Sequence, residues 1–274
     1  MHVTLALLAL LLVVLAQLIW RAVTRERRDY ARFKRLRSTA LRRKVFRRWI
    51  VESWLMLGGL AAIVLLAAGS FVAPALADAR AWGPFALIPY DSEEVTGFLI
   101  GLAIAVLLAM VVPVLLLRRR LDEVPAIGDI RAILPRNRGE LPYGAGLGLT
   151  AGIVEELLFR LALPALLFGV LGGVLPGDVG VGPLAFLLAA LLFGALHLYQ
   201  GPVGILFAFL LGLVFTVLYV VTGSILAPIV LHALVDLRSL VLIPVALGGA
   251  WGIDTPPSPA TRPSAPAAPP ADPA

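Results

Sequence analysis

The sequence predicts an all-α protein, a polytopic transmembrane helical bundle of about seven spans. Of its 274 residues, 60% are hydrophobic and 15% are charged, whereas soluble globular chains carry about 45–50% apolar and about 25% charged residues. Seven apolar segments are long enough to cross a bilayer, which takes about 20 helical residues at about 1.5 Å each. This composition excludes a water-soluble enzyme.

The first half of the chain predicts three spans, at residues 3–20, 50–76 and 95–117. No Lys or Arg precedes the first span, whereas residues 21–48 carry 13 Lys and Arg against only Glu26 and Asp29. Because basic loops stay on the cytoplasmic side, the first span is expected to be an uncleaved anchor with its N-terminus outside. The acidic loop 78–94 should then lie outside, and the loop 118–140, with six Arg, inside.

The second half predicts four further spans, at residues 141–170, 183–199, 203–221 and 224–247. The fourth opens on a glycine-rich stretch, so an alternative is an interfacial piece followed by a helix from about Thr150. Only Thr222 and Gly223 separate the sixth and seventh spans, which leaves open that one of them is broken or re-entrant. Seven spans give an N-out, C-in topology.

Composition divides the chain into four predicted parts: an N-terminal anchor helix with a basic cytoplasmic loop (1–49), two transmembrane helices with their loops (50–140), a membrane core (141–250) and a Pro/Ala-rich tail (251–274). The tail is expected to be disordered. In the third predicted span, Gly97 and Gly101 have the spacing of small residues that lets membrane helices pack closely.

Net charge and residue usage restrict partners and location. The formal charge of +6 is concentrated in residues 21–48, between two apolar segments, so it predicts contact with anionic lipid and no nucleic-acid binding. The chain has no Cys, which excludes disulfides, thiolate catalysis and Cys-bound metal. Arg outnumbers Lys by 21 to 2, an excess that favours a bacterial source and therefore the inner membrane.

Ionisable residues are rare in the second half, and their positions indicate a site. Residues 141–247 contain eight: Glu155, Glu156, Arg160, Asp178, His197, His232, Asp236 and Arg238. Asp178 stands in a glycine-rich loop and is expected to be hydrated. The other seven lie in apolar segments, where a charge at the bilayer centre costs at least ~2.5–3.5 kcal/mol. Pairing, a water-filled cavity or function must compensate for that cost.

Glu155, Glu156 and Arg160 form the first cluster. Glu156 and Arg160 have the i,i+4 spacing of an intrahelical ion pair, which explains both residues structurally. Glu155 projects about 100° away around the helix and has no local partner. A carboxylate without a partner in a low-dielectric site suits a general base, so Glu155 is the first candidate for a functional role.

Two histidines complete the set. His197 ends the segment Phe193-x-x-x-His197, and by itself it is more typical of an interfacial histidine bonded to water or a carbonyl group. His232 and Asp236 are spaced i,i+4, so the carboxylate could hold the imidazole tautomer, stabilise the protonated ring or share a metal with it. Arg238 faces elsewhere and is expected to extend toward water or to neutralise Asp236.

In these motifs the sequence resembles the CAAX proteases and bacteriocin-processing enzymes, the CPBP or Abi family of intramembrane glutamic endopeptidases. The family pattern is Glu-Glu-x-x-x-Arg, then Phe-x-x-x-His, then His-x-x-x-Asn or Asp. All three parts occur here in order, from Glu155 to Asp236, and the resemblance covers about residues 141–247. Asp236 stands where the prenyl-protein proteases have Asn, which adds a negative charge.

The resemblance implies an intramembrane endopeptidase acting on membrane-associated proteins or peptides, with residues 141–250 as its catalytic core. Glu155 and His197 would activate water, while His232 and Asp236 would polarise the carbonyl and stabilise the oxyanion. Glu156 and Arg160 would orient the helix or contact substrate, and Phe193 would support His197. No cofactor is expected.

Three alternatives stay open on the residues alone. Glu155, His197, His232 and Asp236 could hold zinc or another divalent ion, although metal-independent catalysis is favoured. A proton-coupled transporter would also place Glu, His and Asp inside the membrane, but the sequence has no internal symmetry between related halves. A non-catalytic immunity or binding protein could keep the same motifs.

Overall fold

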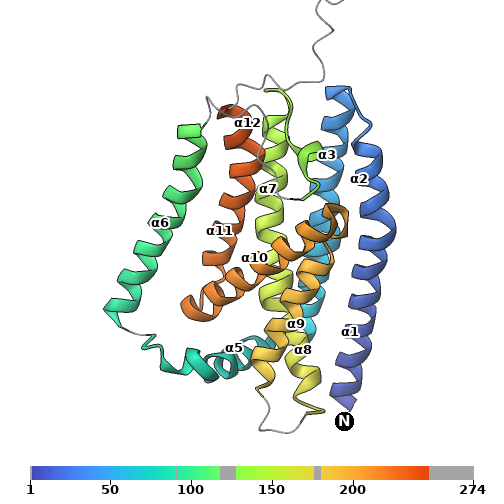
Figure 1. Cartoon of the computed structure of the whole chain (residues 1–274). Coiled ribbons are helices and arrows are strands. Elements are labelled where there is room, and N and C mark those ends of the chain that lie inside the picture. The colour runs from blue at the N-terminus through green and yellow to red at the C-terminus, as the bar shows by residue number, and fades with distance from the viewer. Residues whose placement is uncertain (1, 91, 118–127, 176–179, 247–274) are drawn as a thin grey trace, which may run out of the picture.

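The protein is an all-helical bundle (Figure 1). The computed structural model describes residues 2–90, 92–117, 128–175 and 180–246, and this part of the chain contains helices and no strand. The predicted fold class is therefore confirmed. The predictions for Asp178, for residues 118–127 and for the tail at 251–274 concern residues outside the described ranges.

Two long helical rods form one edge of the bundle (Figure 1). The first rod joins α1 (His2–Trp20), the π-helical η1 (Arg21–Glu26) and α2 (Arg27–Phe33). The second rod joins α3 (Thr39–Ser53), the π-helical η2 (Trp54–Gly58) and α4 (Gly59–Ala68). Ion pairs connect the two rods, with Arg25 Nη2 2.6 Å from Glu52 Oε1 and Arg48 Nη2 2.8 Å from Asp29 Oδ2.

The basic segment at residues 21–48 is helical over most of its length, so its prediction as a loop is wrong. Only residues 34–38 connect the rods. The first rod has 32 residues and is therefore about 48 Å long, compared with about 30 Å for a hydrocarbon core. The charged residues extend the helices beyond the apolar part rather than interrupting them.

The second rod ends at Ala68, eight residues before the predicted end of the span at residues 50–76. Ala68 leaves the helical region at φ −124° and ψ 7°, and the short 3-10 turn η3 (Gly69–Phe71) follows it. After this turn α5 (Val72–Arg80) runs across the lower end of the bundle in Figure 1. Hydropathy alone could not show this change of direction, because both sides of the turn are apolar.

Helix α6 (Glu93–Leu117) stands apart from the bundle in Figure 1 and follows the 3-10 turn η4 (Gly83–Leu87). A Cβ atom at Gly97 or Gly101 would meet no neighbouring atom within 4 Å. Within the described residues, the close packing predicted at these glycines is therefore wrong. One polar contact reaches α6 from the bundle, because Arg238 Nε donates to Met110 O at 3.0 Å.

The rod formed by α7 (Leu141–Glu156), the π-helical η6 (Leu157–Ala162) and α8 (Leu163–Leu171) is continuous. The alternative of a helix that begins near Thr150 is therefore wrong. Pro142 lies in the first turn of α7, where its missing N–H breaks no helical hydrogen bond. The short 3-10 turn η5 (Arg131–Ile133) precedes this rod.

The remaining helices are α9 (Val181–Ala195), the 3-10 turn η7 (Leu198–Gln200), α10 (Gly201–Thr222), α11 (Leu226–Leu237), the π-helical η8 (Arg238–Leu242) and α12 (Ile243–Ala246). Gly223, with φ +66°, ends α10 in the left-handed conformation that glycine adopts without strain. Helices α10 and α11 are therefore separate elements that meet at a tight turn.

Among the residues that the structure describes, five helical segments are long and apolar enough to cross a membrane: His2–Phe33, Thr39–Arg80, Glu93–Leu116, Leu198–Thr222 and Leu226–Ala246. The α7–α8 rod carries three charged residues, and the apolar α9 has 15 residues. The α7–α8 rod and α9, added to the five segments above, bring the number of spans to about seven. Residues 34–38 and α12 lie at one end of the bundle, and His2 and α5 lie at the other (Figure 1).

Glycines bring α7 and α11 into direct backbone contact. A Cβ atom at Gly152 would lie 2.9 Å from Ala233 N, and one at Gly148 would lie 2.9 Å from Asp236 Cβ. Real Cβ atoms do not approach other atoms so closely, so only glycine fits at this crossing. The close contact brings the end of α7, with its two glutamates, beside His232 on α11.

Candidate active site

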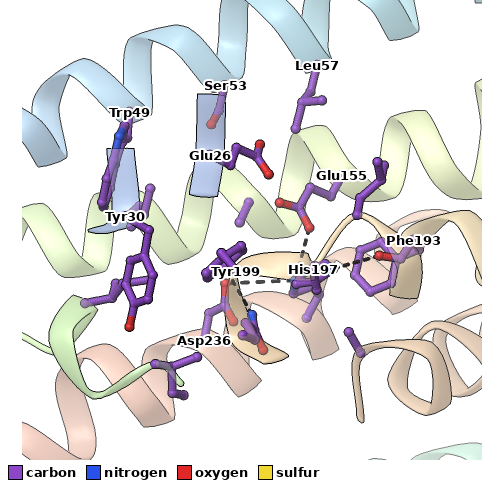
Figure 2. Close-up of a pocket in the computed structure, with 18 of the residues that line it drawn as sticks. Glu26, Tyr30, Trp49, Ser53, Leu57, Glu155, Phe193, His197, Tyr199 and Asp236 are labelled. Carbon is purple, nitrogen blue, oxygen red and sulfur yellow. Dashed lines mark hydrogen bonds and ion pairs between the residues drawn. The ribbon is translucent and has the colours of Figure 1, made fainter. Parts of the chain in front are cut away.

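A cavity of about 350 Å³ lies inside the bundle, within the range of about 300–1,000 Å³ that is usual for ligand pockets. All four predicted catalytic residues line it: Glu155, His197, His232 and Asp236. They come from α7, from the turn after α9, and from α11. Figure 2 shows Glu155, His197 and Asp236 around one space. The fold thus brings together three motifs that are distant in the sequence.

The two adjacent glutamates occupy different environments. The Glu155 side chain is 21% exposed and lines the cavity, whereas the Glu156 side chain is fully buried. Glu156 Oε2 lies 3.0 Å from Arg160 Nε, which confirms the predicted i,i+4 ion pair. Arg160 Nη2 also donates to Gly212 O at 3.2 Å. Arg160 is therefore held by structural contacts to α7 and α10.

His232 is fixed by Glu156. Its Nδ1 lies 2.6 Å from Glu156 Oε1, and because an ionised carboxylate only accepts hydrogen bonds, Nδ1 carries the proton. On the other side of the ring, Nε2 lies 4.0 Å from Glu155 Oε2 and 3.9 Å from Asp236 Oδ2. Three carboxylates therefore surround this imidazole.

Of the three roles left open for Asp236, holding the His232 tautomer does not agree with the structure. Glu156 holds Nδ1, while Asp236 faces Nε2 at a distance longer than a hydrogen bond. The physical reason is the contact of α7 with α11 at Gly152, which brings a carboxylate from another helix to the ring. The i,i+4 spacing within α11 could not reveal that contact.

His197 follows α9 and is oriented by its own preceding turn. Its Nδ1 lies 2.7 Å from Phe193 O, and a carbonyl oxygen only accepts, so Nδ1 carries the proton. In the neutral ring Nε2 then keeps its lone pair. The Phe193 ring lies 4.8 Å from the His197 ring and 6.0 Å from the His232 ring, measured between centroids. Phe193 thus packs against both imidazoles.

Three contacts of aromatic rings at the site were not predicted. The Phe215 ring stacks on His232 with centroids 4.8 Å apart and planes 18° from parallel. Arg160 lies over the Phe193 and Phe215 rings at 4.7 and 5.3 Å. Phe215 stands in a uniformly apolar helix, where no spacing distinguishes it from residues that face lipid.

The N-terminal rods form a wall of the cavity that the sequence did not predict. Arg21, Arg25, Glu26 and Glu52 line the same cavity as Glu155. Arg21 Nε lies 2.7 Å from Glu26 Oε1. Figure 2 shows Glu26 and Glu155 extending from opposite elements toward one space. A signal was present, because Glu26 and Asp29 are the two acidic residues in an otherwise basic run.

π-Helical turns surround the cavity. In the described chain there are four of them, η1, η2, η6 and η8, and each contributes lining residues, for example Glu26, Leu57, Phe159 and Ser239. Single π-helical turns are rare and occur frequently at functional sites, because the additional residue redirects the following side chains. This distribution is independent of the three motifs.

The described residues include no group of three His, Asp or Glu side chains arranged to hold a metal ion. The predicted alternative ligand set of Glu155, His197, His232 and Asp236 lines one cavity, but these residues do not form such a group. Whether the chemistry requires a metal stays a prediction, which chelation can test.

Residues 137–238 match the model of a family described as Rce1-like, type II CAAX prenyl endopeptidase Rce1-like. The match contains all three motifs and confirms the resemblance seen in the sequence. It does not extend to the N-terminal rods, α5 or α6. No curated protein and no solved structure gives a significant match to the chain.

Proposed function

We propose that the protein is an intramembrane endopeptidase, because residues 137–238 match the Rce1-like CAAX prenyl endopeptidase family model. Its substrates are membrane-associated proteins or peptides, and the cavity around Glu155 is the site of hydrolysis. The observation that carries this proposal is the convergence of Glu155, His197, His232 and Asp236 on one cavity inside an apolar bundle.

Glu155 is the general base in this proposal. Its carboxylate is partly exposed to the cavity and lies 4.0 Å from His232 Nε2, a gap that a bound water molecule or a substrate oxygen can bridge. His197 supports the same water through Nε2, whose lone pair is free when Nδ1–H donates to Phe193 O. Glu155 removes a proton from the water while the water oxygen attacks the scissile carbonyl carbon.

His232 stabilises the resulting oxyanion. In the protonated ring, Nε2–H donates to the negative oxygen, while Glu156 keeps the ring in place through Nδ1. When the tetrahedral intermediate collapses, the C–N bond breaks and the protonated Glu155 returns its proton to the leaving amine. The products are a new carboxyl terminus and a new amino terminus, with one water consumed.

Asp236 has an electrostatic role in this scheme. An ionised Asp cannot donate a hydrogen bond to an oxyanion, so it does not replace the Asn of the prenyl-protein proteases atom for atom. Its carboxylate is 3.9 Å from His232 Nε2 and stabilises the positive charge of the protonated ring. Glu156 and Arg160 do not line the cavity, so we assign them to positioning His232 rather than to substrate contact.

The proposal includes the membrane environment. The exposed basic residues at the end of the first two rods, Arg27, Arg28, Arg32, Arg35, Arg37, Arg43, Lys44 and Arg47, form a surface that would bind anionic lipid headgroups. This end faces the cytoplasm in the N-out, C-in topology that charge predicts, in the inner membrane if the source is bacterial.

An experiment that does not require a known substrate tests the proposal. Solubilised membrane protein is incubated with the purified enzyme, and new peptide termini are identified by mass spectrometry. We expect new termini with the wild type and none with Glu155→Ala or His197→Ala. Cleavage by the wild type should persist after exhaustive chelation. Unchanged cleavage by both variants would contradict the proposal, and loss on chelation would restore the metal-dependent alternative.

A further inference from the structure

Phe215 of α10 is fully buried and lies flat against the His232 ring. The centroids of the two rings are 4.8 Å apart and their planes are 18° from parallel, and Phe215 is 0% exposed. Phe193, by contrast, lies nearly at right angles to the same imidazole, with planes 87° apart. Phe215 belongs to none of the three sequence motifs, so its contact with the imidazole has no role in the mechanism described above.

Gly212, about one helical turn earlier, explains why Phe215 can come so close. A Cβ atom at Gly212 would lie 3.1 Å from Phe193 Cδ1, which is tighter than an ordinary contact. The Gly212 carbonyl oxygen also accepts a hydrogen bond from Arg160 Nη2 at 3.2 Å. Residues three apart lie on one face of a helix, so Phe215 points toward the same α7–α8 rod as Gly212. The missing side chain and this hydrogen bond hold α10, and with it the Phe215 ring, in place.

The charges around His232 indicate what the ring contributes. Glu156 binds two groups at once, because its Oε2 lies 3.0 Å from Arg160 Nε and its Oε1 lies 2.6 Å from His232 Nδ1. When His232 is protonated, this one carboxylate therefore faces two positive charges. Glu155 and Asp236 face the other ring nitrogen, at 4.0 and 3.9 Å, where the proposed mechanism places water and the substrate.

The face of an aromatic ring adds negative potential at this point. It attracts a cation that lies within about 6 Å of the ring centroid, and the attraction is stronger where water is excluded. Arg160 Cζ lies 5.3 Å from the Phe215 centroid, and the His232 ring lies 4.8 Å from it. Phe215 therefore stabilises positive charge on both partners of Glu156 without adding a further titratable group.

We propose that Phe215 is a positioning residue for hydrolysis, whose ring stabilises the positive charge of His232 while Nε2–H binds the oxyanion. The proposal rests on the endopeptidase function and adds to it a residue outside the three motifs. Because Nδ1 donates its proton to Glu156, a neutral His232 has only a lone pair on Nε2 and cannot donate a hydrogen bond there. Phe215 thus acts through the imidazole rather than on the substrate.

The test changes the charge of the ring face while nearly keeping its shape. Phenylalanine at position 215 is replaced by monofluorinated and by pentafluorinated phenylalanine, which weaken and then reverse the negative face. The matched control carries the same replacements at Phe186, which is buried in α9, packs against Tyr219 at 5.9 Å between centroids and does not line the cavity.

Two quantities are measured on these proteins in nanodiscs. The first is single-turnover cleavage, at varied enzyme concentration, of a peptide that spans a terminus found in the membrane incubation. The second is the NMR chemical shift of the His232 ring nitrogens at one fixed pH. The chain has three histidines, so histidine-selective labelling gives few signals, and His232→Gln assigns them.

We expect pentafluorophenylalanine at position 215 to slow cleavage about tenfold at an unchanged half-saturating concentration, and a single fluorine to slow it less. The His232 nitrogen shifts should move toward those of neutral imidazole, and the Phe186 proteins should match the wild type. Unchanged shifts, an unchanged rate in an active enzyme, or equal changes at both positions would overturn the proposal. If the shifts move but the wild type cleaves no peptide, Phe215 still stabilises the imidazolium and only the endopeptidase function is wrong.

Discussion

The adjacent residues Glu155 and Glu156 have different surroundings and, in the proposed mechanism, different roles: Glu155 acts in catalysis and Glu156 holds the structure together. Glu155 lines the cavity, while Glu156 is buried between Arg160 and His232. Removing one member of a buried ion pair leaves the other charge without compensation, at a cost of ~3–5 kcal/mol. Removing a partly exposed carboxylate has no such penalty. The two positions should therefore respond differently to the same change.

We predict that Glu156→Gln lowers the melting temperature clearly, because Arg160 loses its counter-ion and His232 Nδ1–H is left with only a neutral amide oxygen as acceptor. Differential scanning fluorimetry of the protein in nanodiscs measures the shift. Glu156→Gln/Arg160→Met should recover part of the stability, since the unpaired charge is then absent. A melting temperature equal to that of the wild type in Glu156→Gln would contradict the buried network.

A second residue-scale prediction concerns Asp236. We expect Asp236→Asn to retain cleavage, because the amide can donate to an oxyanion directly. The pH dependence of kcat should change, since a carboxylate 3.9 Å from His232 Nε2 no longer stabilises the protonated ring. The direction of the change follows from the charge that is removed. Without the Asp236 carboxylate the His232 imidazolium loses its proton at a lower pH, so the alkaline limb of the activity profile should move to lower pH. An identical pH profile would argue against this role.

At the scale of elements, the contact between α7 and α11 sets the site. Gly148 and Gly152 allow the two helices to approach until backbone atoms touch, and this contact brings Glu156 to His232. Helix α6 has similarly spaced glycines but no neighbour at them. The same sequence spacing therefore has different consequences, depending on whether a helix faces a partner.

We predict that Gly152→Ala separates α7 from α11 and weakens both stability and activity. The new Cβ would lie 2.9 Å from Ala233 N, and such overpacking typically costs ~1–3 kcal/mol. Gly101→Ala is the matched control, because nothing lies within 4 Å of its Cβ and Ala favours the helix. Melting temperature and cleavage rate measured on both variants check this prediction, and equal behaviour of the two would contradict it.

At the scale of the whole molecule, the sequence predicted the helical class, the apolar segments and the four cavity residues, because charge is rare enough to mark a site. It did not predict the turn at Ala68, the helical course of residues 21–48 or the tautomer partner of His232. Each of these depends on contacts between distant segments or on local backbone geometry. The pairing of Arg21 with Glu26 was missed because residues five apart do not face each other in an α-helix.

The topology provides a further prediction, and the absence of Cys makes it easy to measure. We expect Trp82→Cys to react with a membrane-impermeant maleimide in intact cells, because residue 82 is exposed and lies next to α5 at the predicted outer end. Ser38→Cys, in the turn between the rods, should react only after permeabilisation. The reverse pattern would invert the proposed orientation.

The central claim is that Glu155 activates water for peptide-bond hydrolysis, and its most direct test is a single-turnover rate. Wild type, Glu155→Gln and the control Glu52→Gln are compared in nanodiscs on a peptide that spans a terminus found in the membrane incubation. We predict that Glu155→Gln slows cleavage at least about 100-fold with an unchanged melting temperature, while Glu52→Gln cleaves at the wild-type rate. A Glu155→Gln rate within about threefold of wild type, ~0.7 kcal/mol in the barrier, would contradict the claim.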